Sequence, residues 1–98
     1  MIVRHGVRPE VPPYLEGFAK LALAAGQPER AARLLGAAEA LRDQLSVPIP
    51  FIEQADHNQA VTQARERLGE AVFTAIWAEG QAMTLEQSIA YASAADTG

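Results

Sequence analysis

The chain places its apolar residues at helical spacing over most of its length. Between residues 28 and 46 they recur at alternating steps of three and four, which puts them on one face of a helix. The positions on this face are Ala31, Leu34, Ala38, Leu41 and Leu45. Residues 13–25 are apolar over a wider arc, roughly 200° of a helical wheel. In that segment only Glu16 and Lys20, a pair four residues apart, form a polar edge.

Glycine and proline mark the ends of these two segments. Pro13 suits the first position of a helix, and Gly26 suits the position just after a helix end. The second segment begins at Pro28 and ends before Val47-Pro48-Ile49-Pro50, because each proline pushes the residue before it out of the α-helical region. Since only two residues separate the segments, we expect an antiparallel helical hairpin over 13–46.

A second helical unit is expected over residues 50–95. Its first helix should run from 50 to 68, with the polar stretch 56–59 as a kink or a second helix start. A further helix is expected from 70 to 79, with Gly80 as its end. Thr84 and Gln87 then have the spacing of a capping box, which begins a last helix. We expect Phe73 and Trp77 to pack this unit against the helix over 50–68, with an exposed anchor for a partner as the alternative.

The predicted fold is therefore all-α, with four to five helices in one domain over residues 13–95. It consists of the hairpin over 13–46, which is similar to a tetratricopeptide (TPR) hairpin, followed by the C-terminal helices over 50–95. Residues 1–12 hold a glycine and two prolines and are expected to form an irregular arm, with a short strand through Ile2 and Val3 as the alternative. Residues 96–98 are expected to be a frayed tail.

Composition narrows the classes of function. The net charge is −4, and the eight Lys and Arg residues are interleaved with twelve Asp and Glu residues, so no basic face for nucleic acid is evident. The absence of cysteine excludes disulfides and thiolate chemistry. No apolar run approaches the ~20 residues of a membrane-spanning helix, and the N-terminus lacks the apolar core of a signal peptide. We expect a cytoplasmic protein with no direct nucleic-acid partner and no membrane partner.

Two histidines are the first candidates for chemistry. Glu53 and His57 lie four residues apart, so both would face the same side of a helix and could bind a metal ion with a third ligand. No such ligand is evident, and we expect a solvated polar stretch with no metal and no cofactor. His5 lies in the N-terminal arm between Arg4 and Arg8 and is expected to be exposed.

The remaining residues show no catalytic pattern. Hydrolysis by paired carboxylates needs two acids that converge in a pocket, but the acids fit solvated helix faces or ends: Glu66, Glu70, Glu79 and Glu86. The serines lack the glycine-flanked turn of a nucleophile: Ser46, Ser88 and Ser93. We therefore expect no enzyme. A small enzyme that uses His57 and acids is the remote alternative.

The hairpin resembles a TPR motif. The residues at the spacing of that motif are Leu15, Phe18, Ala19, Gly26, Ala31, Leu35 and Ala38. Two positions depart from it, since Ala22 replaces a usual aromatic residue and Asp43 stands where the motif has proline. The resemblance covers one repeat only.

A second resemblance spans about residues 15–92. The segments LLGAAEALR and FTAIWAEGQAMTLE are similar to the C-terminal region of large bacterial LuxR-type and cyclase-associated (MalT-like) signalling ATPases. The resemblance implies a TPR-like superhelix for inducer sensing or protein contact, and some members have a DNA-binding helix-turn-helix further on. This chain has no glycine-rich phosphate loop and no basic recognition helix, so neither ATP hydrolysis nor DNA binding is implied. A fragment or a free-standing relative of such a regulator is expected.

The wide apolar arc of the first helix suggests how such a module would act. A single repeat cannot bury its apolar face alone, so we expect this face to meet another chain, most simply a second copy in a homodimer. The expected interaction surface is Tyr14, Leu15, Glu16, Phe18, Lys20 and Leu23. The alternative is that the helices over 50–95 fold back over this face. The function expected is a non-enzymatic protein–protein interaction module, with small-ligand (inducer) binding as the alternative.

Overall fold

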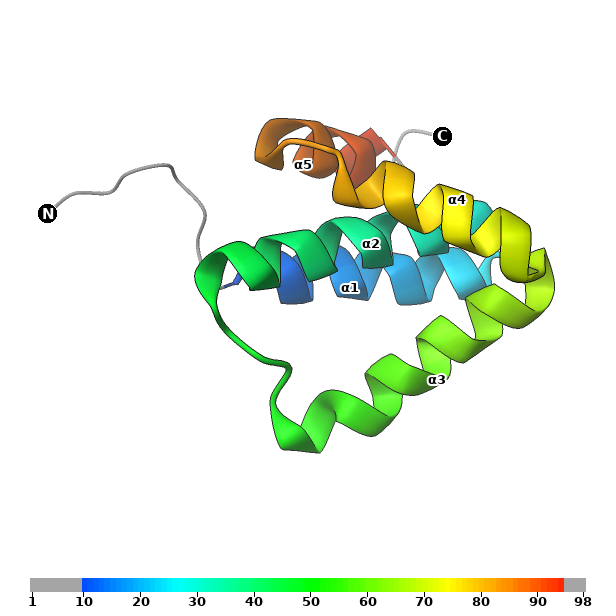
Figure 1. The fold of residues 1–98 in the computed structure, drawn as a ribbon, viewed down its shortest axis with the longest axis horizontal. Helices are drawn as coiled ribbons and strands as arrows, with labels where there is room; N and C mark the ends of the chain where they lie inside the picture. Colours follow the sequence, from blue (N-terminus) through cyan, green and yellow to red (C-terminus); the bar gives the residue numbers. More distant parts are fainter. Residues whose placement is uncertain (1–9, 95–98) are drawn as a thin grey trace, which may run out of the picture.

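The computed structural model describes residues 10–94, and this part of the chain is all-α with five helices (Figure 1). The helices are α1 (Val11–Ala24), α2 (Pro28–Leu45), α3 (Phe51–Leu68), α4 (Glu70–Gln81) and α5 (Leu85–Ala94). These bounds lie within about two residues of those expected from periodicity and breaks, as is usual for helix ends. The expected arm and tail lie largely outside the described residues, as does His5. No described helix is long and apolar enough to span a membrane.

Helices α1 and α2 form the expected antiparallel hairpin. Gly26 adopts a φ of +77°, a left-handed conformation that glycine reaches at little cost. This turn lets the Gln27 N–H donate to the Ala22 carbonyl at 2.8 Å, which closes the end of α1. The hairpin buries Leu15 and Leu34 completely and so forms the centre of the core.

Helices α2 and α4 run in the same general direction (Figure 1) and pack through a reciprocal pair of glycines. A Cβ at Gly36 of α2 would overlap the carbonyl oxygen of Trp77, and a Cβ at Gly80 of α4 would overlap that of Arg33. Gly80 was expected to end its helix, but α4 continues to Gln81 and Gly80 is buried against α2. Its role is therefore to allow the two main chains to approach. Phe73 is buried beside this contact, whereas Trp77 is only partly buried.

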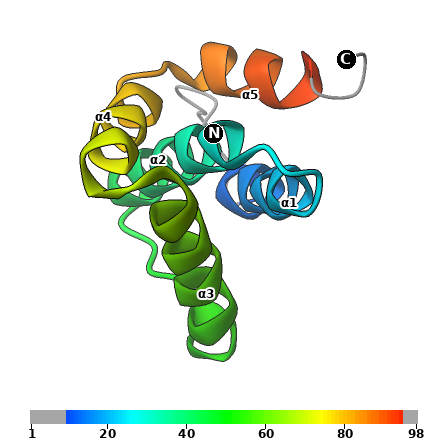
Figure 2. The same ribbon diagram turned by 90° about the vertical axis from the view of Figure 1, so that its right-hand side faces the viewer.

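Helix α5 lies across the hairpin and contacts both α1 and α2 (Figure 2). Its start has the expected capping box, because the Gln87 N–H donates to Thr84 Oγ1 and the Thr84 N–H donates to Gln87 Oε1, both at 3.0 Å. Tyr91 holds the helix to α2: Arg33 donates to its hydroxyl at 2.8 Å, and the Arg30 guanidinium lies 4.2 Å from its ring centroid.

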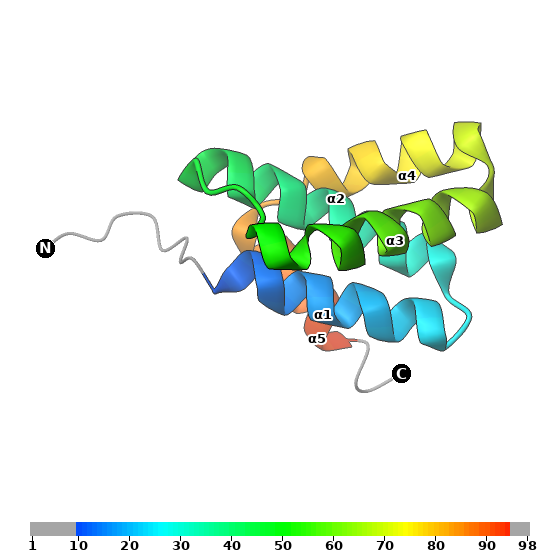
Figure 3. The same cartoon turned by 90° about the horizontal axis from the view of Figure 1, so that it is seen from below.

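Helix α3 leaves the layer that the other helices form (Figures 2 and 3). It is continuous from 51 to 68, so the polar stretch 56–59 is neither a kink nor a second start. Only Ala60 and Ala64 of this helix are buried. Phe51 and Ile52, at its N-terminal end, are each 87% exposed.

The apolar face of α1 is covered within the chain. Leu15 is 0% exposed and Leu23 is 5% exposed, because α2, α3 and α5 all pack against α1. Phe18 is partly buried and stacks edge-on against Tyr14, with the ring centroids 5.1 Å apart. The expectation for this face is corrected for Leu15 and Leu23, which are covered by α2 and by the helices over 50–95 that fold back, as in the alternative.

Candidate functional site

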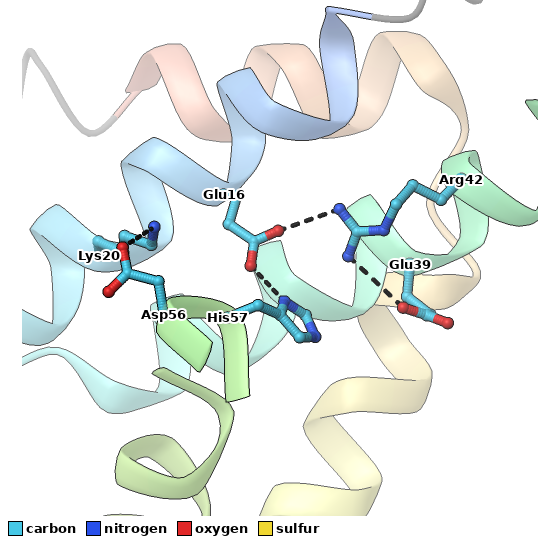
Figure 4. A network of polar contacts seen from close by, with 6 residues as sticks. All are labelled: Glu16, Lys20, Glu39, Arg42, Asp56 and His57. Carbon is cyan, nitrogen blue, oxygen red and sulfur yellow. Dashed lines mark hydrogen bonds and ion pairs between the residues drawn. The ribbon is translucent and has the colours of Figure 1, made fainter. Parts of the chain in front are cut away.

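A buried ion cluster joins α1, α2 and α3, with Glu16 at its centre (Figure 4). One carboxylate oxygen of Glu16 accepts a hydrogen bond from Arg42 Nη1 at 3.0 Å, and the other contacts His57 Nδ1. Arg42 Nη2 lies 3.4 Å from Glu39 Oε1. The Arg42 and Glu16 side chains are only 9% and 10% exposed. The cluster therefore holds α3 to the hairpin through a carboxylate that is shielded from water.

The surroundings of Glu16 favour its ionised form. Burial by itself raises the pKa of the Glu16 carboxyl, because charge is disfavoured away from water. The hydrogen bond and charge of His57, followed by those of Arg42, more than offset this, and the pKa of Glu16 lies below its ordinary value. Since the carboxylate is ionised at neutral pH, it can only accept, and His57 Nδ1 is the donor in this contact.

A second ion pair lies beside the cluster, closer to solvent. Lys20 Nζ of α1 is 3.1 Å from Asp56 Oδ2 of α3. Glu16 and Lys20 were expected to pair with each other along one helix. Instead each reaches across to α3, because α3 packs along this edge of α1.

An open cavity of about 230 Å³ lies between α1, the linker over 46–50 and α3, next to the ion cluster. Its walls are formed by prolines and aliphatic side chains: Pro12, Pro13, Val47, Pro48, Ile49 and Pro50. Gly17 also lines the cavity, and a Cβ added there would meet nothing within 4 Å. Glu16, Arg42 and His57 contribute polar groups, and Lys20 and Glu53 contribute charges. The site thus offers apolar walls next to ionised groups, a combination found in small-ligand sites.

The two candidate metal ligands, Glu53 and His57, have different surroundings in the structure. Glu53 is exposed, while His57 is half-buried and contacts Glu16, so the expectation of a solvated stretch is wrong for His57. Within residues 10–94 no group of three or more His, Cys, Asp or Glu could hold a metal ion. His57 and Glu16 lie side by side in a partly enclosed site, where they contact each other.

The other catalytic candidates have structural roles or face solvent. Ser88 is buried and its hydroxyl donates to the Leu85 carbonyl at 2.8 Å. Ser46 ends α2 in a left-handed conformation with a φ of 57°, and Ser93 is exposed. The four carboxylates named above are all exposed: Glu66, Glu70, Glu79 and Glu86. Two of them pair with arginines, Glu79 with Arg33 and Glu70 with Arg65.

The predicted interaction surface is divided between the core and the surface. Leu15, Glu16 and Leu23 are buried, whereas Tyr14 is 43% exposed. Lys20 is exposed but paired with Asp56. Apolar surface is found instead at the α3 tip, which we define as Val47, Phe51 and Ile52.

The sequence carried one indication of the ion cluster that was not used. Glu16 borders the wide apolar arc of the first helix, and a carboxylate that is buried together with such an arc needs buried partners. Arg42 and His57 could not be identified as those partners from spacing, because they lie 26 and 41 residues further along the chain.

Known proteins of similar sequence are transcriptional regulators. The chain is 40% identical over 82 residues to proteins from Mycobacterium bovis and two strains of Mycobacterium tuberculosis that are named HTH-type transcriptional regulators. The match covers 84% of this chain but 9% of the length of each relative. No protein-family profile matches, and no solved structure matches.

These relatives test two of the expectations. Their name describes regulators and not enzymes, which agrees with the expectation of no enzyme. The expectation of no direct nucleic-acid partner is overturned, because helix-turn-helix (HTH) proteins bind DNA. The sequence similarity supports the general class of transcriptional regulators. It does not support the narrower assignment to the LuxR-type or MalT-like group.

Proposed function

We propose that this chain acts in transcriptional regulation as a TPR-like helical module, and that its α3 tip packs against another helical segment of a longer regulator. The 40% identity to HTH-type transcriptional regulators carries the first part of this proposal. Their length supports the second part, because the matched region is only 9% of each relative and most of the relative's chain lies outside it. The resemblance to the helical region of LuxR-type regulators supports the same role, in the cytoplasm.

The α3 tip fits a helical partner in the same polypeptide. Phe51 and Ile52 are adjacent, and each is 87% exposed, an unusual cost for two large apolar side chains. They lie at the end of the helix that projects from the layer of the other four (Figure 2). A stacked helical unit would bury them, since units of a helical array complete each other's core.

The test mutates the α3 tip in the full-length protein, expressed in its own cells. The double change Phe51→Ser, Ile52→Ser should leave the stability of the chain unaltered, because both side chains are already in water. We expect the transcript profile of cells with this variant to match that of a gene deletion. Val72→Ser, at a 46% exposed position on α4, is the matched control and should behave like the unchanged protein.

Two results would refute parts of this proposal separately. If the double variant leaves transcripts unchanged while the deletion alters them, the role of the α3 tip is refuted. If the deletion itself alters no transcript, the regulatory role is refuted.

Direct DNA binding is the second candidate, favoured by the HTH-type name of the relatives. Helices α4 and α5 are joined by three residues, 82–84, a connection length typical of a helix-turn-helix. Neither helix contains Lys or Arg, so phosphate contacts would come from elsewhere. Among the arginines in residues 10–94, only Arg65 and Arg67 are exposed, both at the C-terminal end of α3.

Fluorescence anisotropy with labelled genomic fragments over a salt series tests this candidate. Binding should weaken with salt, and the double change Arg65→Gln, Arg67→Gln should reduce the slope of log K against log salt by about 2. No binding at about 50 mM salt, where phosphate contacts are strong, would exclude direct DNA binding by this chain.

A further inference from the structure

We propose that the cavity between α1 and α3 binds a small apolar amine, with the hydrocarbon part against the prolines and the ammonium group at Glu53. This inference goes beyond the proposed function and does not depend on it. It follows from the shape, the wall chemistry and the charge of the cavity.

The cavity is open because α3 touches α1 only along part of its length. The linker over 46–50 carries the chain away from α2 before α3 begins, and the cavity lies between this linker and α1. Gly17 faces it without a side chain, and a Cβ there would have no neighbour within 4 Å. A volume of about 230 Å³ corresponds to about eight water molecules, at roughly 30 Å³ each, which is room for a small organic molecule.

The walls favour a hydrocarbon ligand. Four prolines line the cavity, two from the start of α1 and two from the linker: Pro12, Pro13, Pro48 and Pro50. Proline has no backbone N–H, so these walls present C–H groups and few donors. Val47 and Ile49 extend the same apolar surface. Contact with such walls releases water from a ring or a short chain.

The charges favour a cation. Lys20 and Arg42 are already paired, with Asp56 in the first case and with Glu16 and Glu39 in the second. Glu53 lines the cavity, and its carboxylate has no ion-pair partner among the described residues. Of the two carboxylates that line the cavity, Glu16 is held by Arg42 and His57, so Glu53 is the one that an added cation can pair with. An ammonium group would complete this arrangement, whereas a carboxylate would face repulsion.

Benzylamine is a suitable probe because it is a small organic molecule and is charged at neutral pH. Binding would be measured by amide chemical shifts in nitrogen-15-labelled protein. We expect benzylamine to shift the amides of Gly17 and His57 in a saturable way. Benzyl alcohol, its neutral counterpart, and benzoate, its anionic counterpart, should bind more weakly or not at all.

Two variants and one control test the position of the ligand. Gly17→Leu should abolish binding, because the side chain fills the cavity while leucine remains a good helix former. Glu53→Gln should weaken binding by about fivefold, the upper range for an exposed ion pair. Glu86→Gln on α5 removes a charge elsewhere and should bind like the unchanged protein.

Four results would overturn the inference. The first is equal or tighter binding of benzoate or benzyl alcohol. The second is unchanged affinity in a Gly17→Leu variant whose helical content is preserved. The third is unchanged affinity in Glu53→Gln, which would place the ammonium group elsewhere. Absence of any saturable shift with benzylamine would also overturn it.

Discussion

Gly80 of α4 lies directly against the main chain of Arg33 in α2, so close that a Cβ would overlap the Arg33 carbonyl oxygen. Gly36 of α2 makes the equivalent contact with Trp77 of α4. Each glycine thus allows the backbone of the other helix to approach closely. This reciprocal contact sets the distance between the hairpin and the C-terminal unit, and it determines where α5 lies over the core.

Alanine at Gly80 or Gly36 should therefore destabilise the protein. Because the obstacle is backbone rather than a flexible side chain, we expect a loss of about 3 kcal/mol, at the upper end of overpacking effects. Urea denaturation followed by circular dichroism would measure it.

Gly17→Ala is the matched control for this prediction. Its Cβ would meet nothing within 4 Å, so only the better helix propensity of alanine acts, with a gain of about 0.5–1 kcal/mol. Equal effects at positions 17 and 80 would show that the close approach of α2 and α4 is not present.

The ion cluster predicts a pH dependence of stability. The pKa of Glu16 is lower in the folded chain than its ordinary value of 4.5. The stabilising contribution is therefore fully present above pH 4.5 and is lost as the pH falls through the folded pKa. Glu16→Gln should destabilise at neutral pH, and its difference from the unchanged protein should shrink as the pH falls below 4.5.

Urea titrations at several pH values would check this behaviour. Glu86→Gln is the control, because Glu86 is exposed on α5. A difference between Glu16→Gln and the unchanged protein that stays constant down to about pH 3 would contradict the prediction, since the Glu16 carboxyl of the unfolded chain is largely protonated there.

Substitutions at two leucines of α1 test whether its apolar face is buried within the chain or between two molecules. Leu15 is 0% exposed and Leu21 is 65% exposed. Leu15→Ala should cost about 2–5 kcal/mol by loss of contacts and creation of a cavity. Leu21→Ala should change stability by less than about 0.5 kcal/mol.

The comparison is best made at several protein concentrations. If the effect of Leu15→Ala depended on concentration, the leucine would be buried between molecules, and the internal packing of α1 described above would be incorrect.

The capping box of α5 predicts a local effect. Thr84→Ala removes the oxygen that accepts the Gln87 N–H at 3.0 Å, with an expected cost of about 1 kcal/mol. Hydrogen exchange should accelerate in α5 first, because the cap acts on that helix alone. Thr74→Ala, at an exposed position within α4, is the control and should leave exchange in α5 unchanged.

The sequence by itself determined the helices and their order. Apolar periodicity, Gly26, the proline linker and the Thr84 capping box are local features, and each acts within a few residues of the chain. For this reason the all-α fold, the hairpin and the helix limits could be predicted closely. The role of Gly80 could not be predicted from the sequence. A glycine near a helix end looks the same in sequence whether it ends the helix or allows another helix to pack closely against it.

The tertiary structure decided which surfaces are covered and which groups meet. Leu15 and Leu23 of α1 are buried because α2, α3 and α5 pack against this helix, while Phe51 and Ile52, equally apolar in sequence, remain in water. Glu16 meets Arg42 because α1 and α2 form the hairpin, and it meets His57 only because α3 returns along α1. Periodicity shows which face of a helix is apolar, but the partner of that face depends on how distant segments cross, and that is a property of the whole packed chain.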